Sequence, residues 1–221
     1  MKRDGRKIVG VVAWDTPTAQ ILERAGVDIV SVGDSVGVNL WGREHEGDVT
    51  LEEMLLVCRA VRRGVERALV SCDLPSGEGI DGARRLVAEC GADVVKVEDA
   101  DDASAFVDAG IPVFAQFSGG SESDDDLVAQ ATRLEDAGAS LLDFRNSGPV
   151  AGPKVVAAVE IPVLGGLGGG PWLDGRMRMI HRAVGYGSSA RDAYANVAQI
   201  TYDAIAAYAD DVRSGRQIRG G

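Results

Sequence analysis

Three acidic residues stand where short apolar runs of the sequence end. Asp34, Asp73 and Glu98 each close one such run. If those runs are neighbouring strands, three carboxylates meet at one rim, where they repel one another and lose hydration unless a positive charge lies among them. An all-oxygen site of this kind favours a hard divalent cation such as Mg2+. The alternative is that each acid caps the helix that follows, but three acids in successive units favour the metal site.

A lysine accompanies the last of these acids. Lys96 lies two residues before Glu98 and so points to the same side of an extended strand. It could neutralise a substrate carboxylate, form a Schiff base with a carbonyl, or pair with Glu98. Position alone leaves these three roles open.

The elements that must position these residues follow from the hydrophobic pattern. Short β-branched runs predict strands, and longer amphipathic segments between them predict helices. The predicted strands span residues 8–13, 28–32, 68–71, 93–97, 111–115, 140–142, 161–164 and 177–181. The predicted helices span residues 16–25, 51–64, 82–90, 103–109, 124–137 and 150–159, and a long one follows at about 190–212.

Helix boundaries are marked by capping signals. Thr50 and Glu53 form a capping box at the start of the second helix. Gly26, Gly91 and Gly138 each follow a helix and precede a strand, where glycine supplies the left-handed residue that ends the helix. Strands that read as continuous apolar runs belong to a parallel sheet covered on both faces. We therefore predict an α/β fold, a single-domain (β/α)8 TIM barrel over residues 1–221, whose chemistry lies where strands end.

Composition narrows the class of partner and compartment. The net charge is −11, from 34 acidic and 23 basic side chains, which disfavours nucleic acid and anionic membrane. No segment approaches the length of a membrane span. The three cysteines, Cys58, Cys72 and Cys90, have no paired spacing, so a disulfide framework is not expected. A reducing cytoplasm fits these features best.

Several segments, in order and at similar spacing, resemble the ketopantoate hydroxymethyltransferase family. They include residues 13–19, 32–37, 49–54, 61–64, 72–75 and 95–98, and the similarity resumes in 134–142, 161–165 and 174–185. The family has a (β/α)8 barrel of the phosphoenolpyruvate mutase/isocitrate lyase superfamily. The resemblance implies a Mg2+ site, or one for another divalent cation, at Asp34, Asp73 and Glu98. For Ser35 and Lys96 it implies contacts to a 2-oxo acid.

The resemblance also locates three departures. The family's general base, a glutamate, corresponds to Arg145, which cannot accept a proton. The family's histidine at the end of the fifth strand corresponds to Gln116, and the loop that follows is shortened to residues 117–123. Arg145 could bind a second substrate carboxylate or only pair with Asp143. A replacement base could be a metal-bound hydroxide or one of three loop acids: Glu78, Asp81 and Glu122.

These observations lead to one main hypothesis and two alternatives. The main one is a metal-dependent, hydroxymethyltransferase-like enzyme of specialised metabolism, which forms a C–C bond on a small-molecule 2-oxo acid through a stabilised enolate. The first alternative is a lyase or decarboxylase that cleaves a 2-oxo or 2-hydroxy diacid held by Arg145. The second is a non-catalytic barrel subunit. In the family the one-carbon donor is 5,10-methylenetetrahydrofolate, and the shortened loop leaves its binding here open. By resemblance we also expect a homo-oligomer, in the family a decamer.

Overall fold

Eight parallel strands form a closed barrel in the computed structural model, which describes residues 2–98, 100–166, 168–186 and 192–218. The sheet order is β7-β6-β5-β4-β3-β2-β1-β8. Backbone hydrogen bonds from Asp174 N to Val163 O (2.9 Å) and from Met177 N to Gly165 O (3.3 Å) join β7 to β8 and close the ring. The strands are β1 (Ile8–Val12), β2 (Ile29–Val32), β3 (Leu69–Asp73), β4 (Val94–Val97), β5 (Val113–Ser118), β6 (Leu141–Arg145), β7 (Val163–Leu164) and β8 (Gly175–Met179). The (β/α)8 fold predicted from the sequence is confirmed.

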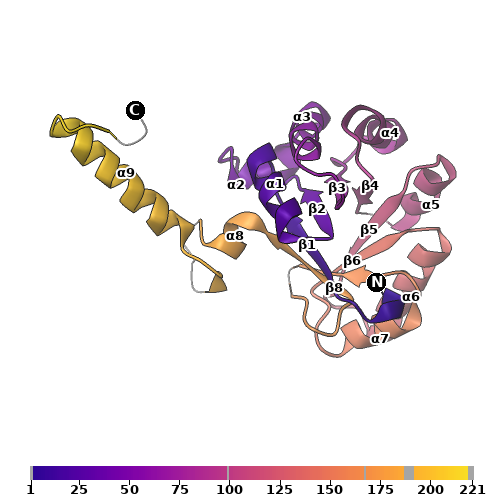
Figure 1. Cartoon of the computed structure of the whole chain (residues 1–221). Coiled ribbons are helices and arrows are strands. Elements are labelled where there is room, and N and C mark those ends of the chain that lie inside the picture. Colours follow the sequence, from indigo (N-terminus) through magenta and orange to yellow (C-terminus); the bar gives the residue numbers. More distant parts are fainter. Residues whose placement is uncertain (1, 99, 167, 187–191, 219–221) are drawn as a thin grey trace. The chain divides into compact units, whose positions relative to one another are not determined.

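Within residues 1–178, helices alternate with the strands and cover the outside of the barrel. Figure 1 shows α3 to α7 arranged around the strands. The helices are α1 (Thr16–Ala25), α2 (Val36–Asn39), α3 (Leu51–Arg62), α4 (Gly79–Cys90), α5 (Ala100–Asp108), α6 (Asp124–Asp136), α7 (Ala151–Ala158), α8 (Ile180–Val184) and α9 (Val197–Arg213). The capping box at Thr50 is present, with Thr50 N donating to Glu53 Oε2 at 2.9 Å. Gly26, Gly91 and Gly138 all have positive φ, as the pattern requires.

The elements differ from the prediction mainly at their ends. β5 runs to Ser118 and β6 to Arg145, because the two strands stay paired as far as Ser118 and Arg145. β8 lies two residues earlier than predicted, because Ile180 already begins α8. The predicted helix at about 190–212 is α9, which begins at Val197 after the cap Asn196; Ala190, its predicted first residue, lies outside the described residues. The short helices α2 and α8 were not predicted.

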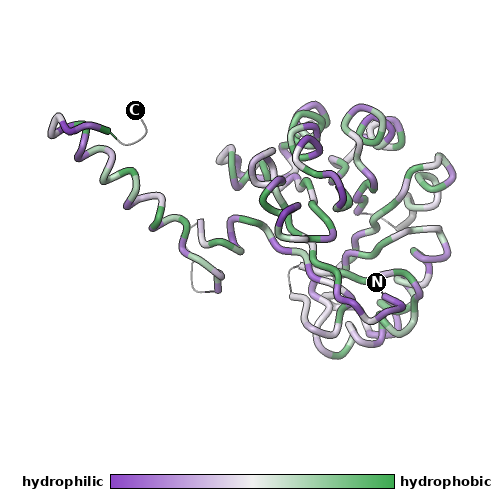
Figure 2. Tube along the Cα trace, viewed as in Figure 1, coloured by the Kyte–Doolittle hydropathy of each residue, from purple (hydrophilic) through white to green (hydrophobic). Residues whose placement is uncertain are grey.

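The chain divides into two compact units, residues 1–178 and 179–221, so the single-domain organisation stays a prediction. Within the second unit, hydrophobic and hydrophilic residues alternate along α9 (Figure 2), and none of its residues is buried. No described helix is both long and apolar enough to cross a bilayer. The three cysteines are free and buried, in line with the absence of a disulfide framework.

The side chains inside the barrel change from apolar to polar along its axis. Near the amino ends of the strands, side chains from seven strands form an apolar layer: Ile8, Ile29, Val94, Phe114, Leu141, Leu164 and Met177. Two residues further along the strands the interior becomes polar, with buried Ser31, Ser71, Lys96, Gln116 and Asp143. Ser71 donates a hydrogen bond to Ser31 at 2.8 Å across neighbouring strands. The apolar layer therefore forms a floor beneath a polar mouth.

Candidate active site

The three predicted acids lie at the carboxyl ends of three successive strands. Asp73 is the last residue of β3, Glu98 follows β4 directly, and Asp34 lies two residues beyond β2. Because β2, β3 and β4 are neighbours in the sheet, these ends share one side of the barrel rim. This rim is the end at which (β/α)8 enzymes carry their active sites.

The carboxylates of Asp34 and Asp73 lie where the protein disfavours their charged forms. Burial, aided by the negative charge of Asp34 and Asp143 and opposed by Lys96, raises the pKa of Asp73 to about 6. Burial, and then the nearby Glu46, also raises the pKa of Asp34 above its usual value. Carboxylates held in this way gain from any cation that enters the site.

Lys96 lies at the centre of the polar mouth. Its Nζ is 3.0 Å from Asp143 Oδ2 and 3.7 Å from Asp73 Oδ1, and it stands 6.0 Å from the ring centroid of Phe114 in the apolar floor. Desolvation favours the neutral amine, but Asp73 and Asp143 outweigh it and raise the pKa of Lys96 above its ordinary value. Lys96 is therefore an ammonium ion. Of the roles that its position left open, it pairs with these two aspartates; Glu98, the acid considered from the sequence, has another partner.

Glu98 instead interacts with Gln116. Gln116 Nε2 donates to Glu98 Oε1 at 2.8 Å, and Glu98 is exposed at the rim. Gln116 was expected at the end of its strand but lies two residues inside β5, with only 8% of its surface exposed. Ser35, buried beside Asp34, lies next to a backbone that has no room for a side chain. A Cβ at Gly33 would come within 2.9 Å of Ser35 Oγ and 3.5 Å of Asp73 Oδ2.

Arg145 ends β6 and faces the same rim. Its Nε lies 3.8 Å from Asp143 Oδ2, so the pairing that the sequence left open is present, while 37% of the arginine side chain remains exposed. The three acids considered as replacement bases are all exposed: Glu78, Asp81 and Glu122. Asp81 was expected in a loop but lies in the first turn of α4. Asp81 is also paired with Arg84 at 3.2 Å.

Asp143 is the site residue that sequence reasoning missed. It is 4% exposed, and it contacts both Lys96 and Arg145. The sequence showed only that it shares a side of the strand with Arg145. That alternation was the available signal, because a carboxylate two residues before an inward-facing residue also points into the barrel. Its partner Lys96 comes from another strand and only the fold brings it near.

The donor set suits a cation that keeps much of its water. Asp73 Oδ1 is buried and accepts no hydrogen bond within the described residues. No three His, Cys, Asp or Glu side chains in the described ranges are grouped so as to hold a metal ion. Mg2+ commonly binds through one or two carboxylates together with waters and substrate oxygens. Asp34 and Asp73 fit that requirement, and the assignment of the full set with Glu98 stays a prediction.

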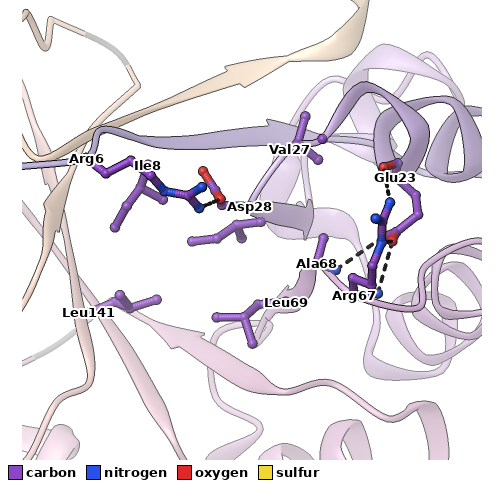
Figure 3. Close-up of a pocket in the computed structure, with 11 residues that line it drawn as sticks. Arg6, Ile8, Glu23, Val27, Asp28, Arg67, Ala68, Leu69 and Leu141 are labelled. Carbon is purple, nitrogen blue, oxygen red and sulfur yellow. Dashed lines mark hydrogen bonds and ion pairs between the residues drawn. The ribbon is translucent and has the colours of Figure 1, made fainter. Parts of the chain in front are cut away.

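The opposite end of the barrel holds a cavity of about 370 Å3. Figure 3 shows Arg6 paired with Asp28 on one side and Glu23 with Arg67 on the other, with apolar side chains between them. Asp28 Oδ2 also accepts from Val9 N at 2.9 Å, and Glu23 Oε2 from Ala68 N at 3.2 Å. Both acids are thus paired with an arginine and with the backbone. We place the chemistry at the other end.

Fold and site together define a (β/α)8 barrel enzyme with carboxylates and a buried ammonium at its carboxyl-end mouth. Residues 1–120 and 117–217 match the family model described as ketopantoate hydroxymethyltransferase. The 3-methyl-2-oxobutanoate hydroxymethyltransferase of Geobacillus kaustophilus (strain HTA426) is 33% identical, over 96% of this chain and 87% of that protein. The enzyme of the same name from Salinibacter ruber (strain DSM 13855 / M31) is 32% identical, over 96% and 92%. This chain belongs to the ketopantoate hydroxymethyltransferase family, a family of transferases.

Solved structures with the same fold come from the phosphoenolpyruvate mutase/isocitrate lyase superfamily. A 2,3-dimethylmalate lyase matches with a TM-score of 0.66 at 16% identity, covering 100% of this chain and 86% of that one. A phosphonopyruvate hydrolase in complex with oxalate and Mg2+ matches with a TM-score of 0.63 at 15% identity, over 97% and 85%. At these identities the likeness establishes the fold.

Proposed function

We propose that this chain is a divalent-metal-dependent enzyme that forms or breaks a C–C bond next to the carbonyl of a 2-oxo acid. The observation that carries the proposal is the ammonium of Lys96, held at the barrel mouth between Asp73 and Asp143. A buried cation beside acids that lack enough partners suits an anionic substrate bound together with a metal ion. Membership of a transferase family supports the reaction class.

Each residue of the mouth has a role in this proposal. Asp34 and Asp73, with Glu98 at the rim, would hold the cation. When bound, the cation supplies Lewis-acid polarisation of the substrate carbonyl, which favours loss of a proton from the neighbouring carbon. Lys96 binds and orients the substrate carboxylate through charge-assisted hydrogen bonds, and the hydroxyl of Ser35 contacts the same acid. In this proposal Lys96 acts electrostatically, through its ion pairs with Asp73 and Asp143.

A second candidate function is cleavage or decarboxylation of a diacid. Arg145 favours it, because this residue combines an inward position with an exposed guanidinium and so could bind a second carboxylate. In that case Arg145→Ala weakens the binding of diacids much more than that of monoacids. Equal weakening of both classes removes this candidate.

The family further suggests 5,10-methylenetetrahydrofolate as one-carbon donor and a homo-oligomer, decameric in the family. The substitutions at Gln116 and Arg145 and the shortened loop after β5 support a specialised substrate. Product formation with and without the folate, and the solution mass by light scattering, test these two expectations separately.

The experiment that tests the main proposal is deuterium exchange at C3 of a panel of 2-oxo acids, followed by NMR. We expect exchange with at least one acid that requires Mg2+ or another divalent cation and stops with a chelator. Lys96→Met should abolish it, because the substrate carboxylate loses its ammonium partner. Lys154→Met serves as the matched control, because Lys154 is an exposed lysine paired with Asp124 on the outer helices.

Absence of exchange with every acid would argue for the non-catalytic barrel. Isothermal titration separates that case further, because a purely structural subunit has no reason to bind Mg2+ and a 2-oxo acid together.

A further inference from the structure

The seam between β7 and β8 is built differently from the rest of the barrel. The described residues contain no helix between these two strands, and β7 has only two residues. The two strands are the ends of the sheet order, so the seam lacks a continuous ladder and is joined by the two backbone hydrogen bonds that close the ring. A seam with so few backbone bonds needs support from side chains.

The side chain of Lys2 supplies part of that support. Its Nζ donates to three main-chain oxygens: Val156 O at 2.9 Å, Val159 O at 2.7 Å and Ile161 O at 3.0 Å. Asp174 Oδ2 lies 3.2 Å from the same nitrogen, and 17% of the lysine side chain is exposed. An ammonium group has three hydrogens, so the three carbonyls accept all of them while the carboxylate balances the charge.

These four oxygens, which we call the oxygen cage, come from both sides of the seam. Val156 and Val159 lie in the last turn and at the C-cap of α7, where a helix leaves carbonyl groups without partners of its own. The third carbonyl stands two residues before β7. Asp174 directly precedes β8, and its Oδ2 also accepts from Val163 N of β7 at 3.0 Å. Lys2 therefore joins α7 and the start of β7 to the start of β8.

The oxygen cage has the chemistry of a monovalent-cation site. Backbone carbonyls replace the hydration shell of K+ in proteins, and the carboxyl end of a helix attracts positive charge. The single carboxylate, Asp174, balances one positive charge, whereas a divalent ion would leave an excess charge in a partly buried place. The ammonium of Lys2 thus stands where a free monovalent cation would bind.

We propose that the oxygen cage is a monovalent-cation site that the chain fills with its own lysine, so that the N-terminal segment, residues 2–7, latches the seam of the barrel. The ligand class is K+ or a small protonated amine, which the cage takes when Lys2 is replaced. Lys7 supports the latch, because its Nζ donates to Pro171 O at 3.0 Å and Leu173 O at 2.5 Å, on the connection between β7 and β8. The inference is independent of the proposed reaction, because the cage lies at the amino ends of the strands.

The test removes the ammonium group and then returns it from solution. Lys2→Met removes the charge and leaves the three carbonyls and Asp174 without a cation. We expect amide hydrogen exchange in β7 and β8 to become about tenfold faster, with little change in β2 to β4, because the seam opens locally. Potassium or methylammonium chloride should return exchange to within about twofold of the parent by occupying the cage. Tetramethylammonium chloride at the same ionic strength should not, because it has no N–H group to donate.

A control and two opposite results define the outcome. Lys154→Met is the matched control, because Lys154 pairs with Asp124 at 2.9 Å on the outer helices and should leave exchange in β7 and β8 unchanged. Unchanged exchange in Lys2→Met overturns the latch. Faster exchange that no salt reverses, or that tetramethylammonium reverses equally well, overturns the cation site.

A second measurement uses the unaltered chain and holds even if Lys2→Met does not fold. The succinimidyl ester of acetic acid acylates accessible amines, and peptide mass spectrometry gives the rate at each lysine. We expect Lys2 to react at least about tenfold more slowly than Lys154, because its hydrogens are donated within the fold and reaction requires local opening. Equal rates at the two lysines contradict the proposal.

Discussion

The two ends of the barrel interior treat charge in opposite ways. At the amino end, Arg6 and Asp28 pair with each other, as do Glu23 and Arg67, and both acids also accept backbone hydrogen bonds. At the carboxyl end, Asp73 interacts with Asp34 and Asp143 and with Lys96 and Arg145. Three buried oxygens there have no hydrogen-bond partner among the described residues. The two acids at the amino end are thus paired within the protein, whereas three oxygens at the carboxyl end are not.

This difference identifies the carboxyl end as the end where buried charge lowers the stability of the fold. Buried carboxylates without full pairing destabilise a folded chain, and such groups persist where a ligand completes them. The apolar floor lies directly beneath this arrangement, with the ring centroid of Phe114 6.0 Å from Lys96 Nζ. The four predictions below test this contrast, beginning with the largest expected effect.

Removing the ammonium group of Lys96 should abolish the reaction proposed for the carboxyl end of the barrel. Lys96→Met is expected to lower metal-dependent C3 exchange by about 10³-fold or more, as loss of a charged group that holds the substrate commonly does. The measurement is the exchange rate by NMR at saturating Mg2+. Lys154→Met should retain the full rate. Residual exchange within about tenfold of the parent would show that the substrate carboxylate is bound elsewhere.

Shortening the floor should affect stability more than any single polar change. Leu164 is fully buried in the apolar layer, so Leu164→Ala is expected to lower the free energy of unfolding by about 2–5 kcal/mol. Urea denaturation measures it. Val150→Ala, at an exposed position, is the control and should change stability by less than about 0.5 kcal/mol. A small loss at Leu164 would mean that the floor is loosely packed.

Neutralising one aspartate at each end should change stability in opposite directions. Because the pKa of Asp73 is raised, the folded chain binds a proton at this carboxylate more tightly than the unfolded chain does. Ionisation of Asp73 therefore lowers the free energy of unfolding as pH rises toward about 6, and the full loss is reached above that pH. At pH 8 without metal, Asp73→Asn should therefore stabilise the protein by roughly 1–3 kcal/mol. Asp28→Asn should instead destabilise it by about 1 kcal/mol, since a satisfied carboxylate is lost.

Thermal and urea unfolding in the presence of a chelator provide this measurement. The same sign for both substitutions would contradict the contrast between the two ends.

Glu53, on helix α3 outside the barrel, is a carboxylate whose pKa is shifted in the opposite direction from that of Asp73. Hydrogen bonds from Arg43 and from Thr50 N lower the pKa of Glu53 to about 2. Its contribution is therefore present above the unfolded value of 4.5 and is lost as pH falls toward 2. We expect Glu53→Gln to cost about 1 kcal/mol near pH 6, after allowing for solvent screening, and nothing near pH 2. A difference that does not vary with pH would assign the effect to helix capping alone.

The sequence determined the barrel and the position of its acids. The features that predicted it are local. They are the continuous apolar runs, the glycines at the ends of three helices and the capping box at Thr50, and each determines the conformation of its own segment. Asp34, Asp73 and Glu98 were located for the same reason, because the end of a strand is visible in the chain. Gln116 was placed at a strand end and proved internal, since the end of β5 depends on its pairing with β6.

Only the tertiary structure decided which charges meet. Spacing along one strand placed Lys96 on the same side as Glu98 and left its partner open. The partners come from β3 and β6, because the closed barrel brings inward-pointing side chains of different strands together. The same closure places Asp143 beside Lys96 and leaves its second oxygen, with that of Gln116, without a partner. Periodicity gives the side of a strand on which a residue lies, but distances across a closed sheet depend on the stagger and tilt of all its strands.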